Sequence, residues 1–397
     1  MQRRILVLTS TYPRYAGDAT VPPFVHELTR RLTAWFEMHV LAPHAPGSAV
    51  EEQLDGVHMH RFRYLPERME TLAYGGGMLP GLRRYPWRAA GLLPLLTAEY
   101  LAGSRLLRQE DYALIHAHWA VPHGFIGARL KGARALLCTS HGSDLFALDA
   151  PWARPFKRHA LAHADAVTVV SGALGAKAVN LLPGLVPRIL PMGIDTRHFT
   201  PPVAGASRDG LLYVGRLVQD KGVQTLLHAL AALQARGLHP HLKIIGTGPA
   251  ETDLRSLVQA LELTPQVEFL GALPNDTLPE FYRRAAALVF PSLLGSKGQQ
   301  EGMGLVPLEA LACGCPVIAS RLPAVSEVVR DGETGLLFTP GDAVALAGCI
   351  ERMSAEPEMA RSTAATGRQQ VIEAYDWQDV AERYRALYEG LISARRS

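Results

Sequence analysis

Short apolar runs, separated by stretches with helical periodicity, follow one another from the start of the chain almost to its end. Such runs are typical of strands that are buried on both faces of a parallel sheet. A first set is predicted at residues 5–9, 38–42, 114–117, 135–139, 166–170 and 189–191. A second set is predicted at 211–214, 242–245, 267–270, 287–290, 317–319 and 336–338. One open sheet of twelve strands would be unusual, so the sequence predicts two doubly wound α/β domains.

The boundary between these domains is predicted within residues 191–210, which are rich in Pro, Gly and polar side chains. We therefore expect one domain over residues 1–193 and a second over residues 194–375. The remaining segment, 376–397, is expected to be an amphipathic helix, because one stripe carries Val380, Tyr384, Leu387 and Leu391.

Composition narrows the class of protein. With 48% apolar and 19% charged residues, the 397-residue chain is expected to be a globular enzyme. The sequence shows no signal peptide and no apolar run long enough to cross a membrane, so we expect a cytoplasmic location. Residues 1–195 hold 21 Lys and Arg against 15 Asp and Glu, and this excess of 6 favours an acidic partner on that half.

The most informative stretch is residues 291–335, where a glycine-rich polar loop leads into a short apolar helix and then a buried strand. Glu301 lies in the loop and Glu309 in the helix. Their spacing is about two helical turns, so both could face one cleft. The helix start presents unpaired N–H groups that suit a phosphate. The carboxylates suit sugar hydroxyls, and together these features predict a nucleotide-sugar pocket.

Two strings in this region, EGMGLVPLEALACGCPVIAS (301–320) and EVVRDGETGLLFTPGD (327–342), resemble the donor-binding signature of retaining glycosyltransferases of family 4. The resemblance implies the GT-B fold, with two facing Rossmann-like domains and a C-terminal helix that crosses back to the first. The first domain would bind the acceptor and the second the nucleotide sugar. No cofactor is implied beyond that co-substrate, and UDP- or GDP-linked sugars are favoured over ADP-linked ones.

The resemblance extends to the string GRLVQDKG (215–222), which matches the family's phosphate-binding string. Two cations at the carboxyl end of a strand can hold a diphosphate, Arg216 in a bidentate manner and Lys221 as a point charge. Catalytic roles are implied for His141, Arg216, Lys221 and Glu301. Donor binding is implied for Gly17, Gly215, Arg216, Lys221, Gly246, Gly304, Leu305, Val306 and Glu309.

Histidines follow two strands of the first domain. His116, His118 and His123 lie at the end of one strand, where a cleft-lining role is more consistent with the pattern than a metal site. The string TSHGSD (139–144) follows the next strand, and the family implies contact of His141 with the donor sugar or the acceptor. His118 and Asp144 are predicted to bind the acceptor, although Asp144 could equally cap the following helix.

The chain contains no D-x-D string, so the acids that chelate a metal in GT-A enzymes are absent from the sequence. We predict catalysis without a metal, because Arg216, Lys221 and the helix start at Leu305 can supply the positive charge. The pair Cys313-Gly-Cys315 has no second pair, so buried reduced thiols are expected instead.

Residues 61–108 interrupt the alternation of strands and helices. This segment contains three acids and eight arginines: Arg61, Arg63, Arg68, Arg83, Arg84, Arg88, Arg105 and Arg108. One interpretation is a buried helix with a long crossover loop. The other is a face that contacts an anionic membrane or a lipid-linked acceptor, at the inner face of the cytoplasmic membrane.

The sequence thus predicts a retaining, metal-independent hexosyltransferase of family 4. It would act on a lipid-linked or saccharide acceptor in cell-surface polysaccharide or glycolipid synthesis, with no nucleic-acid partner. Two alternatives remain, a nucleotide-sugar 2-epimerase of the same architecture and a protein that binds the nucleotide sugar without catalysis.

Overall fold

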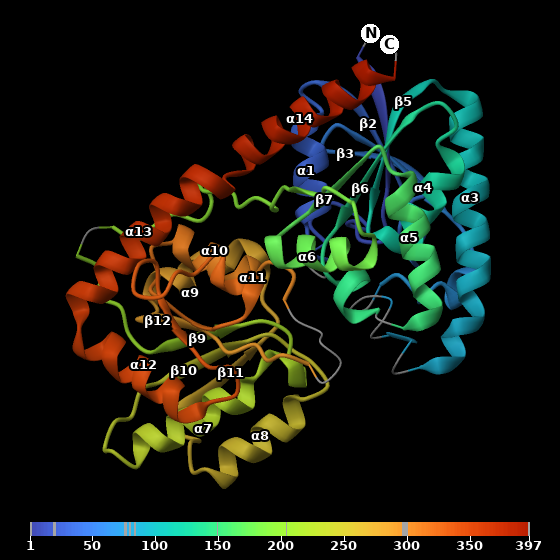
Figure 1. Cartoon of the computed structure of the whole chain (residues 1–397). Helices are drawn as coiled ribbons and strands as arrows, with labels where there is room; N and C mark the ends of the chain where they lie inside the picture. Colours follow the sequence, from blue (N-terminus) through green and yellow to red (C-terminus); the bar gives the residue numbers. More distant parts are fainter. Residues whose placement is uncertain are drawn as a thin grey trace. The chain divides into compact units, whose positions relative to one another are not determined.

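The computed structural model describes residues 2–18, 21–74, 78, 81–82, 85–148, 150–203, 205–295 and 301–395. Contacts divide the chain into two compact units. Unit 1 comprises Met1–Gly193 and Trp377–Ser397, and unit 2 comprises Ile194–Asp376. Each unit has a largely parallel sheet with helices on its faces, as Figure 1 shows, which confirms the predicted fold class.

The sheet of unit 1 has eight described strands in the order β3-β4-β2-β1-β5-β6-β7-β8. Their bounds are β1 Arg3–Leu8, β2 Phe36–Pro43, β3 Glu51–Leu54, β4 Val57–Phe62, β5 Tyr112–His118, β6 Ala135–Ser140, β7 Ala166–Val169 and β8 Arg188–Ile189. The prediction of six strands is therefore wrong for this unit. It missed β3 and β4, which pair antiparallel with each other. Strand β3 is mostly polar and β4 mixes polar and apolar side chains, so neither forms an apolar run.

The helices of unit 1 include the final helix of the chain. Their bounds are α1 Phe24–Leu32, α3 Leu92–Gln109, α4 Phe125–Leu130, α5 Arg154–His163, α6 Gly172–Leu181 and α14 Trp377–Ala394. Helix α14 packs on α1 and β5 and buries Val380, Tyr384 and Leu387, three residues of the predicted stripe. The Arg31 guanidinium lies 5.5 Å from the centre of the Trp377 ring, which adds a cation–π contact between α1 and α14.

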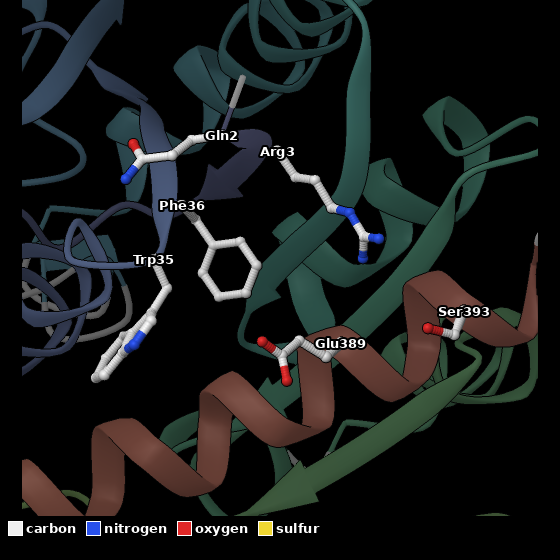
Figure 2. Close-up of a pocket in the computed structure, with 6 residues that line it drawn as sticks. All are labelled: Gln2, Arg3, Trp35, Phe36, Glu389 and Ser393. Carbon is white, nitrogen blue, oxygen red and sulfur yellow. The ribbon is translucent and has the colours of Figure 1, made fainter.

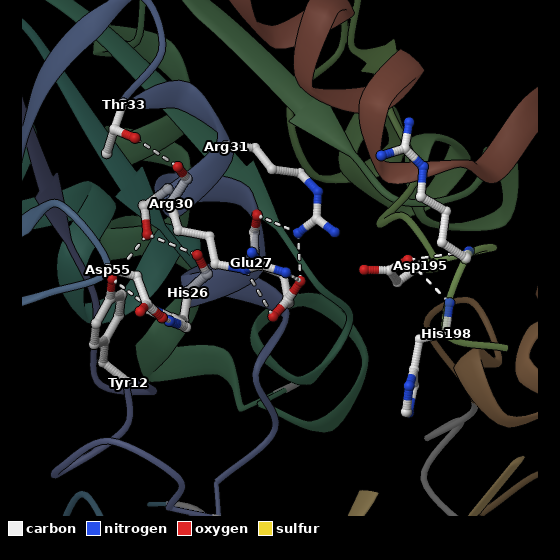
Figure 3. Close-up of polar contacts among 11 residues, drawn as sticks. Tyr12, His26, Glu27, Arg30, Arg31, Thr33, Asp55, Asp195 and His198 are labelled. Carbon is white, nitrogen blue, oxygen red and sulfur yellow. Dashed lines mark hydrogen bonds and ion pairs between the residues drawn. The ribbon is translucent and has the colours of Figure 1, made fainter. Parts of the chain in front are cut away.

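Polar contacts attach α1 to the turn between β3 and β4. Figure 3 shows His26 between two partners, with Nδ1 2.8 Å from the Tyr12 hydroxyl and Nε2 2.8 Å from Asp55. The carboxylate of Glu27 forms ion pairs with Arg30 and Arg31 of the same helix. These contacts fix the start of α1, which follows the loop after β1.

The sheet of unit 2 has six described strands, all parallel, in the order β11-β10-β9-β12-β13-β14. The strands are β9 Leu211–Val214, β10 Leu242–Ile245, β11 Val267–Gly271, β12 Ala287–Phe290, β13 Val317–Ser320 and β14 Leu336–Phe338. All six coincide with predicted runs. The helices are α7 Val223–Gln234, α8 Glu251–Ala260, α9 Leu278–Arg284, α10 Leu305–Ala312, α11 Pro323–Ser326, α12 Ala343–Ala355 and α13 Pro357–Tyr375.

The strand order locates a switch point in each sheet. In unit 1 the chain moves outward from β1 in one direction and then resumes at β5 on the other side of β1. In unit 2 the same reversal occurs between β9 and β12. Ligands of doubly wound sheets bind outside the carboxyl ends of the strands at such points. The loops after β1, β5, β9 and β12 are therefore the places to look for a site.

Candidate functional site

In unit 2 the candidate site centres on Lys221, at the start of α7, and Glu301, in the loop after β12. The Lys221 ammonium donates a hydrogen bond to Glu301 Oε1, and Ser292 Oγ donates to the same oxygen at 2.8 Å. The Lys221 nitrogen also lies 5.5 Å from the centre of the Phe290 ring. Burial alone would raise the pKa of Glu301, but the attraction of Lys221 and these hydrogen bonds lower it, so Glu301 is ionised at neutral pH.

Gly222 explains how the segments around residues 220–222 and 291–293 come together. It adopts φ +67°, and a Cβ there would lie 1.9 Å from the carbonyl oxygen of Pro291 at the end of β12. The amide of Leu293 donates to the Asp220 carbonyl at 2.8 Å across the same junction. A glycine that permits this approach brings Lys221 to the switch point.

The loop that carries Arg216 is built by hydrogen bonds among strand ends. Leu217 N donates to Thr247 O at 2.9 Å, and the Tyr213 hydroxyl donates to Arg216 O at 3.0 Å. A Cβ on Gly246 would lie 1.9 Å from the carbonyl oxygen of Gly215, so this glycine is required for packing of the two loops. The side chain of Arg216 is exposed at the carboxyl end of β9. Its position suits a diphosphate held at the switch point.

Helix α10 starts directly after Gly304, which adopts φ +91° and has no side chain with which to cap the helix. Leu305 and Val306 therefore carry the first N–H groups of the helix, and Pro307 follows them. The first turn contains no acidic residue that would repel an anion. These features fit the predicted phosphate contact. Residues 296–300 of the predicted glycine-rich loop lie outside the described residues.

Glu309 has hydrogen-bond partners different from those of Glu301, and the prediction that both face one cleft stays a prediction. Its Oε2 accepts a hydrogen bond from the Tyr282 hydroxyl of α9 at 2.7 Å, and burial raises the pKa of Glu309 to about 7. Helix α10 begins at Leu305, so Glu301 lies in the loop and Glu309 in the helix, as predicted. Tyr282 was not predicted, since it lies 27 residues before its partner and in no recognisable string.

In unit 1, His118 and His141 meet at the carboxyl ends of β5 and β6. His118 Nδ1 lies 2.8 Å from His141 Nε2, and the two rings stack with centres 5.1 Å apart. Phe24 and Trp119 lie against His141, with ring centres 4.8 and 4.9 Å away. Burial lowers the pKa of His141 to about 3, and burial with the neighbouring histidines lowers the pKa of His118 as well. Both imidazoles are therefore neutral at physiological pH.

The other two histidines of this strand end have separate partners. His116 Nδ1 lies 2.7 Å from the hydroxyl of Tyr388 in α14, and His123 Nδ1 lies 2.6 Å from Glu99 in α3. The three histidines of the string therefore do not converge on one point. A cleft-lining role for these histidines stays a prediction.

Both carboxylate oxygens of Asp144 accept hydrogen bonds from groups of unit 1. Oδ2 accepts from Ala120 N at 2.7 Å, and Oδ1 accepts from Ser140 Oγ at 2.7 Å. Burial raises the pKa of Asp144, although these two hydrogen bonds oppose the rise. Asp144 thus joins the turns after β5 and β6. It caps a turn 24 residues before itself, and not the one that follows it as the capping alternative supposed.

Gly17 lies in the loop after β1 with φ +79°, and a Cβ added there would have no heavy atom within 4 Å. The adjacent Asp18 accepts from Arg14 Nε at 2.7 Å and from the second guanidinium nitrogen at 3.0 Å. This ion pair closes the loop directly beside Gly17. A contact between Gly17 and a donor phosphate stays a prediction.

A surface pocket of unit 1 lies elsewhere. Figure 2 shows it lined by Gln2, Arg3, Trp35, Phe36, Glu389 and Ser393. Arg3 and Phe36 are the first residues of β1 and β2. The pocket is therefore at the amino ends of the strands, opposite the edge at which His118 and His141 lie, and it is no part of the candidate site.

Comparison with known proteins identifies relatives for both units. Residues 22–198 match the family described as Glycosyltransferase Family 4, and residues 203–370 match Glycosyl transferases group 1. A GDP-mannose-dependent alpha-(1-6)-phosphatidylinositol monomannoside mannosyltransferase of Mycolicibacterium smegmatis is 30% identical over 74% of this chain and 80% of its own length. A glycogen synthase of Mycobacterium tuberculosis is 30% identical over 97% of this chain and 94% of its own.

Solved structures show the same architecture. Sucrose-phosphate synthase from Thermosynechococcus elongatus superposes with a TM-score of 0.80 at 24% identity, covering 99% of this chain and 100% of its own. HepE from Anabaena, in complex with UDP, gives a TM-score of 0.73 at 18% identity, covering 98% and 100%. At these identities the likeness is one of fold.

Proposed function

This chain belongs to glycosyltransferase family 4 and has the GT-B fold, and we propose that it is a retaining hexosyltransferase that needs no metal for transfer. The donor would be a nucleoside-diphosphate sugar held by unit 2, and the acceptor a hydroxyl group presented at unit 1. The observation that carries the proposal is the pairing of Lys221 with Glu301 at the switch point of unit 2.

The leaving group of such a transfer is a nucleoside diphosphate, which gains negative charge as the glycosidic bond breaks. Lys221, Arg216 and the N–H groups at the start of α10 would stabilise that charge. Each is placed by backbone contacts that exist before the ligand arrives, so little reorganisation is needed. These groups provide the positive charge that a metal ion supplies in other transferases.

Glu301 would hold hydroxyl groups of the sugar, because its ionised carboxylate accepts hydrogen bonds only. We assign His141 to the acceptor side of the sugar, with His118 as a positioning residue that fixes its ring. Asp144 positions the turns that carry these histidines and stays a predicted acceptor ligand. Glu309, with its pKa near 7, would reach the ribose of the donor.

The bond from the acceptor oxygen to the anomeric carbon would form on the face from which the diphosphate leaves. The acceptor proton would pass to an oxygen of the departing diphosphate. The products are a glycoside of unchanged anomeric configuration and a nucleoside diphosphate. Neutral His141 can orient the acceptor hydroxyl without taking its proton.

The relatives guide the choice of donor. The mycolicibacterial relative is described as GDP-mannose-dependent, and the Anabaena structure holds UDP. We therefore propose a GDP- or UDP-linked hexose in preference to an ADP-linked one. A role in cell-surface polysaccharide or glycolipid synthesis is the corresponding proposal for the product, with no nucleic-acid partner.

A lipid-linked acceptor is supported by the surface around α3. Trp87 is 66% exposed, Leu93 72% and Leu101 57%. Arg88 stacks on Tyr85, with its guanidinium 4.5 Å from the ring centre. Such a mixture of aromatic, aliphatic and cationic side chains suits the surface of an anionic membrane, at the inner face of the cytoplasmic membrane.

Residues 61–108 divide between core and surface. Arg61 is buried and donates to the Ala49 and Pro13 carbonyls, so it does not belong to a membrane-facing set. Arg83 and Arg84 lie outside the described residues. No helix in the described part of the chain is long and apolar enough to cross a membrane. Replacing Trp87 and Leu93 by Ser should reduce retention on anionic vesicles, and unchanged retention would remove this support.

The experiment that tests the proposed reaction is incubation of the protein with GDP-mannose, UDP-glucose and ADP-glucose in the presence of EDTA. Release of nucleoside diphosphate, slowly to water and faster with an added acceptor, is expected for one donor. Formation of a nucleotide sugar epimerised at C2 would favour the epimerase. Binding with no turnover would favour the non-catalytic alternative.

A further inference from the structure

Three histidines and a glutamate lie together on β2 and β4 of unit 1, away from the strand ends that carry the candidate site. His39 and His58 are direct neighbours in the parallel pairing of these strands, and His60 follows two residues later on the same face. Glu37 precedes His39 by two residues and so shares that face as well. Arg4 is the register partner of Glu37, which places the group toward the amino ends of the strands.

From this arrangement we propose that Glu37, His39 and His58 form a binding site for a divalent transition-metal cation of the zinc, nickel or copper class. Each residue offers one ligand atom, and the three atoms lie within 4.8 Å of one another. Among the described residues this is the group of three such side chains whose ligand atoms come this close together. Two imidazoles and a carboxylate favour such cations over magnesium or calcium, which prefer oxygen ligands.

The contact between Glu37 and His39 already has the spacing of two metal ligands. Glu37 Oε1 lies 3.1 Å from His39 Nε2. Ligand atoms around a tetrahedral zinc ion with bonds of about 2.0–2.1 Å are roughly 3.3 Å apart. A carboxylate oxygen can only accept, so the Nε2 atom of His39 carries a proton in this contact. A metal ion would replace that proton.

The other ring nitrogen of His39, Nδ1, has hydrogen-bond partners both with and without a metal on Nε2. Its Nδ1 atom lies 3.0 Å from His60 Nε2 and 3.1 Å from the Tyr112 hydroxyl. Without a metal, Nδ1 accepts a hydrogen bond from one of these groups. With a metal on Nε2, the proton resides on Nδ1 and is donated to His60 or Tyr112. Metal-bound histidines commonly make such a contact, which sets the orientation of the ring.

His58 must move to complete the site. Its ring stacks on that of His39, with centres 4.7 Å apart and planes inclined by 16°, so the nitrogen lone pairs run side by side instead of converging. His58 is only partly buried, which leaves its ring free to rotate toward the cation. Three protein ligands leave a fourth position for water.

Several charged side chains surround the proposed ligands and would affect the binding of a cation. Glu37 also accepts from Arg4 Nε at 3.0 Å, and Arg4 contacts Glu110, so a cation would compete with one arginine. Glu51 adds negative charge 3.8 Å from His60 Nδ1.

The test uses the full chain without a histidine tag, stripped of metal and titrated with Zn²⁺ by calorimetry and with Co²⁺ by visible absorption. One equivalent should bind, and the bound Co²⁺ should show the spectrum of a four-coordinate site. His58→Gln and Glu37→Gln remove ligands from partly exposed positions and should weaken binding at least about tenfold. His198→Gln and His241→Gln remove exposed histidines of unit 2 and should leave it unchanged.

The variant His60→Gln distinguishes a metal site from a histidine cluster that only stabilises the sheet. As an outer partner of His39, His60 should alter zinc affinity by about 10–100-fold without changing the stoichiometry. The proposal is overturned if the wild type binds no Zn²⁺ below millimolar concentration. It is equally overturned if His58→Gln binds as tightly as the wild type.

Discussion

The ammonium of Lys221 and the carboxylate of Glu301 pair at the switch point of unit 2, where the loops after β9 and β12 meet. Each residue satisfies the other in the absence of a ligand. A donor diphosphate would compete with Glu301 for Lys221, and the sugar hydroxyls would compete with Lys221 for Glu301. One contact thus holds two groups ready for the two parts of a nucleotide sugar.

Replacing Lys221 and replacing Glu301 should affect different quantities, the first the affinity for the nucleoside diphosphate and the second the rate of turnover. Lys221→Met should weaken binding of the nucleoside diphosphate by about 10–100-fold, since it removes a charged hydrogen bond. Glu301→Gln should keep that affinity and lower turnover by about 10² or more, because it removes the group that holds the sugar. Calorimetry and assays of diphosphate release measure the two effects. Lys243→Met, which removes an exposed lysine of β10, is the control.

Glu309 should make unit 2 less stable as the pH rises. Its pKa is about 7 in the folded chain and 4.5 as the unperturbed value. Between these values the unfolded chain has lost a proton that the folded chain retains, so stability falls as the pH rises from about 4.5 to 7 and is then constant. At about 1.4 kcal/mol per pH unit, the loss over this interval is about 3–4 kcal/mol.

Glu309→Gln should abolish this fall and raise the melting temperature most at pH 8. The amide keeps the shape of the side chain and does not ionise. Melting curves from pH 4.5 to 8 give the comparison, with Glu268→Gln as an exposed control in the same unit. Parallel pH profiles for the wild type and Glu309→Gln would show that Glu309 is not responsible.

Gly222→Ala should destabilise unit 2 by about 2–4 kcal/mol, in the range that backbone strain and steric overlap produce. The added Cβ would require φ +67° of a non-glycine residue and would overlap the Pro291 carbonyl. Gly348→Ala in α12 is the matched control, because nothing lies within 4 Å of its Cβ position and alanine favours a helix. Denaturant unfolding of both variants measures the difference, and equal stabilities would contradict the account of this junction.

His141→Ala should lower the rate of transfer and leave donor affinity unchanged, because His141 belongs to unit 1. Since its pKa is about 3, its protonation should contribute nothing to the pH dependence of the rate between pH 5 and 8. Donor hydrolysis and transfer can be followed over that range for the wild type and the variant. A loss of donor affinity equal to the loss of rate would contradict the assignment.

Much of the fold follows from the apolar runs, since every predicted strand of unit 2 exists. Strands β3 and β4 were missed because EEQL and VHMHRF are not apolar runs, and their pairing depends on a turn at Asp55 with positive φ. A strand at the edge of a sheet needs only one buried face. Hydrophobicity alone does not reveal it.

The candidate site likewise contains residues that the sequence predicts and residues that only the structure reveals. Arg216, Lys221, Glu301 and Glu309 are visible as strings, and the structure places all four near the ends of unit 2 strands or in α10. Their partners are not visible, because Ser292 and Tyr282 carry no pattern and meet the glutamates only through the fold. Arg61 lies in the arginine-rich segment but is buried, so an excess of arginine in a sequence does not by itself locate a surface.

The most direct test of the central claim is a thermal-shift series with UDP, GDP, ADP and their sugars, with EDTA present, on the wild type and Arg216→Ala. A ligand at 100 times its Kd adds about 2.7 kcal/mol to stability, which is easily detected. The account predicts that a uridine or guanosine nucleotide raises the melting temperature of the wild type and not of Arg216→Ala. If no nucleotide does so, or if binding requires a metal, the donor site proposed for unit 2 is wrong.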